Sequence, residues 1–422
     1  MKRVFLKISV AYISMLIFFV VSMWGIHCIP RDFIRENVKE SAYILQREGL
    51  YKKFFNFGLF QLDNYTDALM MSIAVATDDV RPLYSSMANC VILEQGDPIE
   101  AALYGAEHES DGFEKGIYAR YWHGYQLFLR PLLCITNING IRVINYVLLF
   151  LLAFICLRLL WYNVSKESAV ILGLLMIVIN FPMIPYSMQF STCFYLMFIS
   201  TIVLLAVHGI SRDYSNLLTM FFVVGGATSF FDFLTTPLLA LGIPLTVYIL
   251  KMHPQEKVRC IFNLCFLWGL GYGLIWVSKW MIGSVMIGEN IVGNAINQFL
   301  FRTSTSSLEG EVITMDSFVG LVQACVARHG LQNIISIQHM VCLIGICFAL
   351  AFFVYYNKQK GFEVQKEYWW LLLVASIVPV WLVILLNHTY YHYWFTWRAL
   401  LVTMYASSLW IYYTTRTLKR RY

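Results

Sequence analysis

Two carboxylates, Asp63 and Asp67, lie four residues apart in the segment LDNYTDALMMSIAVA, at the start of an apolar run. Residues at that spacing share one face of a helix. A carboxylate at the membrane face is a candidate general base for an acceptor hydroxyl, and it is also a candidate ligand for a divalent cation. The alternative interpretation is structural, because an Asp just before a helix caps its N-terminus.

A second polar cluster occurs in LNHTYYHYWFTWR, which contains Asn387, His388, His392 and Arg398. The two histidines are four residues apart, so they are candidates to hold a metal ion on one helical turn. No acidic third ligand is adjacent in the sequence, which favours binding of substrate and phosphate instead. Arg398 begins the descent into the membrane, and its planar guanidinium matches phosphate oxygens.

A third cluster, RYWHGYQLFLRPL, places Arg120 and His123 among aromatic residues. Aromatic faces suit sugar rings, and arginine suits phosphate, so these residues are candidates for the wall of a substrate pocket. The alternative is an aromatic belt at the membrane interface, with arginine reaching toward water.

Three isolated charges complete the candidate substrate-binding residues. Asp232 in SFFDFLTTP is the only charge for many residues on either side, and a lone ionisable residue at membrane depth is a functional-site hypothesis. Its alternative role is to cap the next helix. Lys279 in WVSKWMIG and Arg302 in FLFRTS follow, and Lys279 is a candidate either for a lipid-linked phosphate or for simple snorkelling to the interface.

The composition requires these clusters to be positioned by membrane helices. The chain is 59% hydrophobic and only 13% charged, about half the charged fraction of a soluble globular protein. The sequence predicts an all-α integral membrane protein with one polytopic domain over residues 1–422 and about ten transmembrane helices. These helices are expected near 6–26, 140–161, 168–184, 190–208, 216–231, 237–251, 260–282, 338–356, 368–386 and 395–414.

The distribution of basic residues predicts the orientation. With the N-terminus inside, both termini are cytoplasmic in the cell membrane, and most basic residues near helix ends fall inside. The three short outer loops, 185–189, 232–236 and 387–394, contain no Lys or Arg. The net charge of +6 is therefore a topology signal and does not indicate nucleic acid as a partner.

Two extracytoplasmic loops are expected to be large. The first, 27–139, is partly helical and holds 15 of the 25 acidic residues, and the second spans 283–337. The five polar clusters all fall on this outer side, although the topology was derived from basic residues in other loops. That agreement predicts an outward-facing site.

The islands DNYTDA, RYWHGYQ, FFDFLTTP, SKW and NHTYYHYWFTWR, set on this layout, resemble a bacterial branch of the GT-C superfamily of membrane glycosyltransferases. The resemblance lies in an early spanning helix followed by a large outer loop that bears an acid. It covers most of the chain in layout and only these islands in sequence. The adjacent Asp–Glu pair of some relatives is absent.

The resemblance implies a polyprenyl-phosphate-linked sugar donor, a glycan or lipid acceptor of the cell envelope, and transfer with inversion at the anomeric carbon. It implies Asp63 or Asp67 as the base, with Arg398 and Lys279 stabilising the departing lipid phosphate. A divalent cation stays an open question.

Three other functions compete with this one. A lipid-linked oligosaccharide polymerase or ligase would share the topology and the lipid phosphate. A lipid or sugar transporter (flippase) would need ionisable residues deep within helices and two similar halves, and the sequence shows neither. A membrane O-acyltransferase would use His388 or His392.

Overall fold

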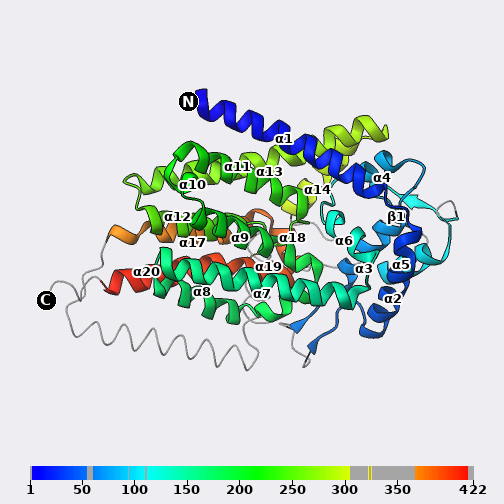
Figure 1. Cartoon of the computed structure of the whole chain (residues 1–422), viewed down its shortest axis with the longest axis horizontal. Helices are drawn as coiled ribbons and strands as arrows, with labels where there is room; N and C mark the ends of the chain where they lie inside the picture. Colours follow the sequence, from blue (N-terminus) through cyan, green and yellow to red (C-terminus); the bar gives the residue numbers. More distant parts are fainter. Residues whose placement is uncertain are drawn as a thin grey trace.

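The computed structural model describes residues 2–54, 60–93, 95–109, 112–304, 322, 325 and 366–416. This part of the chain is almost entirely helical (Figure 1). Its two strands, β1 (Val91–Ile92) and β2 (Lys115–Gly116), form one short antiparallel ladder. The all-α expectation is therefore confirmed for the described residues.

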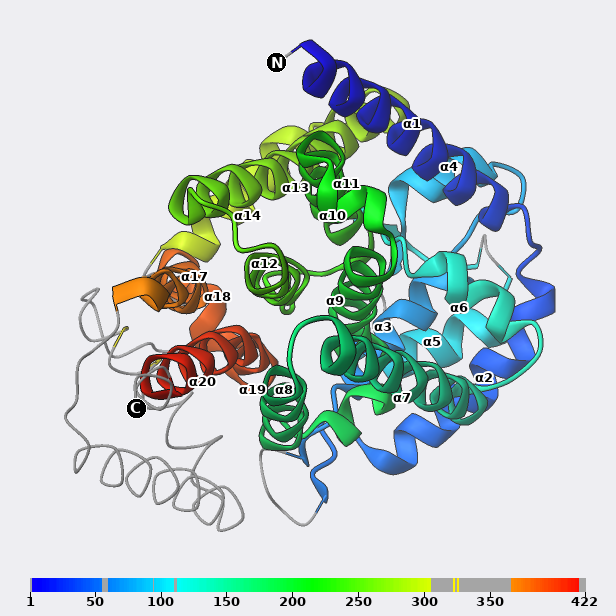
Figure 2. The ribbon, with the colours of Figure 1, turned by 60° about the vertical axis from the view of Figure 1, so that its left-hand side comes forward.

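Five of the described helices are long and apolar enough to cross a membrane. They are α1 (Lys2–His27), α7 (Ile138–Asn163), α9 (Met188–Ala206), α11 (Tyr214–Phe231) and α13 (Lys257–Ile287). Each coincides with a segment that the hydropathy pattern predicts. α1 lies at the periphery of the bundle with many of its large apolar side chains exposed, as expected of a helix that faces lipid (Figure 2).

The remaining apolar helices are shorter than a full span. They are α8 (Lys166–Val178), α12 (Leu239–Met252), α17 (Trp370–Ile384) and α20 (Leu401–Arg416). The predicted span at 338–356 lies outside the described residues, so the count of ten spans stays a prediction. Short helical segments lie between the longer helices. They are η3 (Phe181–Tyr186), α10 (His208–Arg212), η5 (Lys366–Tyr368), α18 (Leu386–Tyr391), α19 (Tyr393–Thr396) and η6 (Trp397–Leu400).

The shortness of α12 has a packing explanation. Figure 2 shows α12 in the middle of the bundle, with α9, α11, α13, α17 and α20 around it. All of its residues from Leu239 to Leu250 are buried. Because other helices surround it, α12 contacts protein rather than lipid and does not need the length of a lipid-exposed span.

The closest helix pair in the bundle depends on glycine. A Cβ at Gly225 of α11 would lie 2.0 Å from the Trp268 carbonyl oxygen, and one at Gly271 of α13 would lie 2.1 Å from the Phe222 carbonyl oxygen. Only glycine permits this approach of two backbones, as is common where membrane helices pack. α11 and α13 therefore pack backbone against backbone at these glycines.

The predicted first loop folds into a small helical cap at one end of the bundle. It contains α2 (Asp32–Glu48), α3 (Asn64–Val75), α4 (Pro82–Ala88), α5 (Pro98–Glu107) and α6 (Gln126–Leu133). In Figure 1 this cap lies at the end opposite to the start of α1 and the end of α20. The two ends of the described chain thus share one end of the molecule.

Local sequence explains where the helices of the cap begin. Asp63 caps α3, Asp97 caps α5 with Pro98 directly after it, and Asn137 caps α7. The second predicted loop, 283–337, begins differently from the expectation. α13 continues to Ile287, and α14 (Ile291–Thr303) follows after a short turn.

Candidate functional site

The two candidate acids lie at the start of α3, where the cap meets the bundle. Asp63 is the N-cap, and its carboxylate accepts hydrogen bonds from the Thr66 amide at 3.1 Å and the Thr66 hydroxyl at 3.0 Å. Asp63 and Asp67 are both almost completely buried. Asp63 therefore caps α3, as the structural alternative predicted. Its burial also changes the pKa of the carboxyl group.

Burial raises the pKa of Asp63 to about 6, although the hydrogen bonds from Thr66, the nearby Trp394 side chain and the charge of Arg398 oppose the shift. A carboxyl group with a pKa near 6 is mostly ionised at neutral pH, and it is more basic than an ordinary carboxylate, so it is suited to take a proton from a hydroxyl. The Trp394 and Arg398 side chains come from the last helical segments, more than 300 residues away in the sequence. The fold therefore joins the first and fifth sequence clusters.

Asp67 has a different environment. Its Oδ1 accepts a hydrogen bond from the Ser187 hydroxyl at 3.1 Å and another from the Met188 amide at 3.0 Å, at the start of α9. Burial raises its pKa to about 7, with the nearby charge of Arg142 opposing the shift and that of Asp63 adding to it. Asp67 thus ties α3 to α9, whereas Asp63 lies within electrostatic range of Arg398.

Arg398 is a buried cation, and two of its N–H groups have no hydrogen-bond partner among the described residues. Its Nη1 donates to the Trp394 carbonyl oxygen at 3.0 Å, and its guanidinium carbon lies 4.2 Å from the centre of the Phe190 ring. Only 1% of the side chain is exposed, yet Nε and Nη2 find no hydrogen-bond partner among the described residues. A buried donor without a partner is costly, so these two N–H groups are a site for an anion or for water.

Other buried polar atoms in this neighbourhood also have no partner in the described part of the chain. They are Asp67 Oδ2, Gln189 Oε1 and His392 Nδ1. Gln189 lies next to Phe190, and the His392 ring lies 5.5 Å from that of Trp394. A polar ligand that carries both hydroxyls and an anionic group could satisfy these unpartnered acceptors and donors around one acid and one arginine.

Aromatic rings lie near the buried Asp63. The Tyr51 and Tyr65 rings stack with centres 6.1 Å apart, and Tyr51 meets Trp394 edge-on at 5.6 Å. Both tyrosines are about 40% exposed; partial burial raises the pKa of each, and the charge of Asp63 adds to the shift. Flat exposed rings beside a buried acid can support a sugar ring. Neither Tyr51 nor Tyr65 stands out in the sequence, where many aromatic residues surround the candidate sites.

His388 joins three segments of the chain. Its Nε2 lies 2.8 Å from the Leu234 carbonyl oxygen, and its Nδ1 is hydrogen-bonded to Arg302 of α14. Burial holds its pKa well below the usual value, with the charges of Arg302 and His392 acting in the same direction. A neutral ring that donates from Nε2 and accepts at Nδ1 satisfies both contacts, so His388 has no nitrogen left for a metal.

His392 lies beside His388, with ring centres 4.6 Å apart. Its Nδ1 is open, as described above, whereas both nitrogens of His388 are occupied. The described residues contain no group of three or more His, Cys, Asp or Glu that could hold a metal ion. Asn387, in the same segment, is buried on α18.

Asp232 lies at the C-terminal end of α11 and closes a turn. Its carboxylate accepts hydrogen bonds from the amide and the hydroxyl of Thr235, three residues on. Leu234, between them, has a left-handed φ of +67°, which is unusual for a non-glycine residue. Asp232 therefore holds the strained turn whose Leu234 carbonyl contacts His388. The observed contacts of Asp232 are structural, in line with the alternative role considered from the sequence. However, Asp232 binds Thr235 in a turn and does not cap α12, which begins only at Leu239.

Arg120 and His123 lie in a wall of aromatic rings. The Arg120 guanidinium lies 4.5 Å from the Tyr118 ring centre, and its Nε has no partner among the described residues. His123 uses both ring nitrogens, one with the Tyr125 hydroxyl at 3.1 Å and one with the Tyr118 carbonyl oxygen at 2.9 Å. Arg120 is thus open to a ligand, and His123 fixes the loop. Arg302 lies close enough to Tyr118 to affect its pKa, which connects this wall to His388.

Lys279 is placed apart from Arg398. Its Nζ donates to the Met87 carbonyl oxygen of α4 at 2.7 Å and lies 5.5 Å from the Trp122 ring centre. It is fully buried between α13 and the cap. These contacts fix the cap to the bundle, and the pairing of Lys279 with Arg398 on one phosphate stays a prediction without a contact that supports it.

A buried polar network beside Asp67 was not selected from the sequence. Arg142 of α7 makes a two-pronged ion pair with Glu48 of α2, with nitrogen–oxygen distances of 3.0 and 2.9 Å. Asn64 accepts from Arg142 at 3.1 Å and donates to Glu48 at 3.1 Å. Arg142 is an ionisable residue near the start of a long apolar helix. Arg398 has the same kind of position, so the same sequence feature could have identified Arg142.

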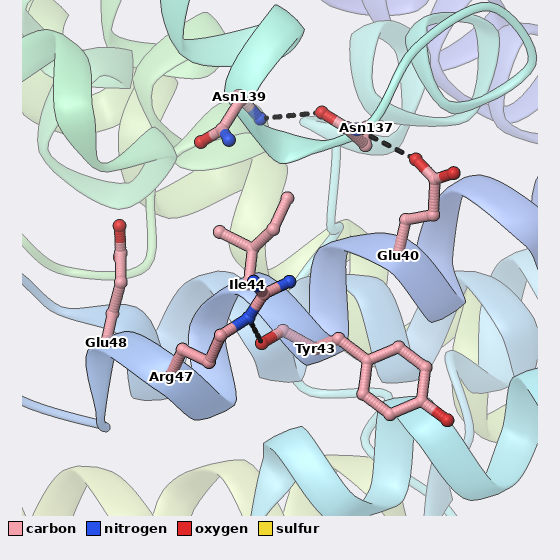
Figure 3. A pocket seen from close by; sticks show the side chains of 7 residues that line it. All are labelled: Glu40, Tyr43, Ile44, Arg47, Glu48, Asn137 and Asn139. Atoms are coloured by element: carbon pink, nitrogen blue, oxygen red, sulfur yellow. Dashed lines mark hydrogen bonds between the residues drawn. The ribbon is translucent and has the colours of Figure 1, made fainter.

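A surface pocket of about 560 Å³ lies on the outer side of this network, between α2 and the start of α7 (Figure 3). Its lining residues are Glu40, Tyr43, Ile44, Arg47, Glu48, Asn137 and Asn139. Asn137 donates to Glu40 at 2.9 Å across the pocket. Glu48 is the one lining residue that also belongs to the network next to Asp67, so this pocket adjoins the acid site without containing it.

The fold thus gathers Asp63, Arg398, His392 and the Arg302–His388 pair, while Lys279 and His123 serve other contacts. Comparison of the chain with protein-family models, with curated proteins and with solved structures finds no match.

Proposed function

We propose that the protein is a membrane glycosyltransferase that moves a sugar from a polyprenyl-phosphate donor to a cell-envelope acceptor on the extracytoplasmic face. The observation that carries the proposal is the pair of Asp63 and Arg398. A buried carboxylate with a raised pKa lies within electrostatic range of a buried arginine that has two N–H groups without a described partner. An acid and an anion-binding cation in one site are what glycosyl transfer from a lipid phosphate requires.

The residues have distinct roles in this reaction. Asp63 accepts the proton of the acceptor hydroxyl as that oxygen attacks the anomeric carbon. The bond between the anomeric carbon and the phosphate oxygen breaks, and its electron pair leaves with the polyprenyl phosphate. Arg398 donates from Nε and Nη2 to the departing phosphate, where a fixed charge in a water-poor site is most effective. Tyr51, Tyr65 and Trp394 supply flat surfaces for the sugar.

Arg302 and Arg120 extend the positive wall away from Asp63. Neither forms an ion pair with an acid in the described ranges, and His388 orients Arg302 through its Nδ1. We assign these two arginines to the donor side of the site. His392 and Gln189 lie nearer to Arg398 and Phe190, and their open polar atoms are suited to sugar hydroxyls.

The orientation belongs to the same proposal. The cap, which carries Asp63, lies at the end of the bundle opposite to both ends of the described chain. The basic residues at the other end assign that end to the cytoplasm. The site then opens on the extracytoplasmic face, where polyprenyl-linked sugars are available to it.

The direct test is sugar transfer in membranes that contain the protein. Mass spectrometry of cell-envelope glycans, with and without the gene, identifies the added sugar. Membranes are then supplied with that sugar on a polyprenyl phosphate, and transfer is compared between the wild type and Asp63→Asn. Loss of transfer in the variant with unchanged expression supports the proposal. An unchanged glycan profile without the gene, or full transfer by Asp63→Asn, contradicts it.

A further inference from the structure

At the end of the molecule opposite to the cap, α7 and α8 line an open apolar groove. The two helices are consecutive and antiparallel, joined by a turn of two residues at 164–165, and they lie side by side (Figures 1 and 2). The groove has a volume of about 660 Å³. It is lined by Phe154, Leu157, Arg158, Trp161, Tyr162, Ala169, Val170, Gly173 and Leu174.

The two ends of this groove differ in chemistry. Away from the turn, the wall is apolar, with exposed Phe154, Val170 and Leu174. Near the turn, the groove ends at Arg158, Trp161 and Tyr162, and Lys166 begins α8 just beyond it. An apolar channel that ends in cations and interfacial aromatics has the polarity of a phospholipid in one leaflet.

The cations are held at the rim by aromatic rings. The Arg158 guanidinium lies 6.0 Å from the Tyr162 ring centre, and the Lys166 ammonium lies 5.5 Å from that of Trp161. Neither cation forms an ion pair with an acid in the described ranges, and both are exposed. Glu167 follows Lys166 in the first turn of α8 but does not line the groove. The rim therefore presents two cations that an anionic headgroup can approach.

The groove exists because residue 173 has no side chain. A Cβ at Gly173 would meet only Leu157 Cδ1, at 3.7 Å, which is an ordinary van der Waals distance. Alanine is therefore tolerated there, while a longer side chain would extend into the groove. α8 itself is fixed on its other side, because Ser168 and Ser165 bind the Tyr405 and Tyr413 hydroxyls of α20. The groove is thus a preformed feature between two fixed helices.

We propose that this groove binds an anionic phospholipid of the leaflet at the end that holds both ends of the described chain. The acyl chains lie along Phe154, Gly173 and Leu174, and the phosphate lies between Arg158 and Lys166. Basic pockets between membrane helices bind anionic headgroups in this way. The site is independent of the proposed glycosyl transfer, because the acid site lies at the other end of the molecule.

Native mass spectrometry of the purified full chain tests the site. Phosphatidylglycerol and phosphatidylcholine with identical acyl chains are added in turn, and the fraction of protein with one bound lipid is measured. The wild type is expected to retain phosphatidylglycerol in preference. In Arg158→Gln/Lys166→Gln, the affinity for phosphatidylglycerol is expected to fall about 25-fold, which corresponds to roughly 1 kcal/mol per basic residue.

Two further variants separate charge from shape. Gly173→Leu fills the groove and is expected to reduce retention of phosphatidylglycerol at least tenfold, whereas Gly173→Ala leaves it unchanged. Arg212→Gln/Arg259→Gln removes two cations at the same end outside the groove, and it is expected to keep the preference. Thermal unfolding of each variant checks that the fold is intact.

Three outcomes would overturn the proposal. They are a wild type that retains both lipids equally, a preference that survives Arg158→Gln/Lys166→Gln, and an equal loss in Arg212→Gln/Arg259→Gln. Equal retention of both lipids would also be expected if an apolar segment of this chain, such as 338–356, occupied the groove.

Discussion

Arg142 of α7 and Glu48 of α2 form a two-pronged ion pair that joins the helical cap to the bundle. The two side chains are 6% and 17% exposed, so both charges are largely removed from water. Burial raises the pKa of Glu48, but the hydrogen bonds and charge of Arg142 outweigh this effect and bring the pKa below its usual value. The ion pair therefore stabilises the folded cap at pH values above the pKa that Glu48 has in the unfolded chain. This stabilisation is lost as the pH falls through the lower pKa of folded Glu48.

This pair makes a prediction about stability. Arg142→Met is expected to lower the free energy of unfolding by roughly 3 kcal/mol, because it leaves the Glu48 carboxylate buried without its partner. The double variant Glu48→Gln/Arg142→Met should recover part of this loss. Thermal unfolding of the purified protein measures both, with Arg259→Met, which breaks an exposed pair with Glu256, as control. A loss in Arg142→Met no larger than in the control would show that the pair contributes little.

The two acids at the start of α3 should respond differently to the same substitution. Asp63→Asn is expected to reduce sugar transfer by at least about 100-fold, because an amide cannot take the acceptor proton. Asp67→Asn should keep most of the activity, because its oxygen can still accept from Ser187 and Met188. Transfer in membranes at equal protein level decides between them. The reverse pattern would move the base to Asp67.

Asp67→Ala adds a structural control to that comparison. It removes the acceptor that receives the Ser187 and Met188 hydrogen bonds, and it should lower the free energy of unfolding by about 1–2 kcal/mol. Asp67→Asn should leave the free energy of unfolding nearly unchanged, since its oxygen accepts the same bonds.

The raised pKa of Asp63 predicts the acid side of the pH–rate profile. Because the base must be ionised, transfer should fall about tenfold per pH unit below about 6. The sign for stability is opposite. The folded pKa lies above the usual 3.8, so protonation favours the folded state, and the free energy of unfolding should rise as pH falls from about 6 to about 4. Unfolding of the wild type and Asp63→Asn at several pH values isolates this contribution, and identical pH dependence in both would exclude it.

Arg398→Lys tests the phosphate role. Lysine keeps the charge but removes the planar fork, so use of the polyprenyl-phosphate donor should weaken by about tenfold or more while use of the acceptor changes little. Donor and acceptor KM are measured separately, with Arg259→Lys as a control for a general effect of the substitution. Unchanged donor kinetics would reject the two-pronged contact and would move the phosphate toward Arg302, His388 and His392.

Cys28 provides a test of orientation without an introduced label. It is exposed and unpaired just after α1, at the end of the bundle that carries the cap, and Cys90 is also unpaired. A membrane-impermeant maleimide is expected to label the protein in intact cells, and Cys28→Ser should remove most of that label. Labelling that requires permeabilised cells would place the cap in the cytoplasm and would contradict the proposed location of the site.

The sequence by itself determined the apolar helices and the residues that stand out against them. α1, α7, α9, α11 and α13 follow from long apolar runs, since a bilayer requires such length and composition. Arg398, His388 and Asp63 could be selected because an ionisable residue in an apolar setting is costly and needs a reason. Helix capping by Asp63 could also be read locally.

Only the tertiary structure decided which of these residues meet. Asp63 lies within electrostatic range of Arg398, while Asp67 binds the start of α9 and Lys279 binds the Met87 carbonyl. Such contacts depend on how distant helices pack, and no pattern of residue spacing encodes that packing. The same holds for α12, whose short length is explained by neighbours that replace lipid around it. The charge of a side chain is a local property, but its partner is a property of the whole fold.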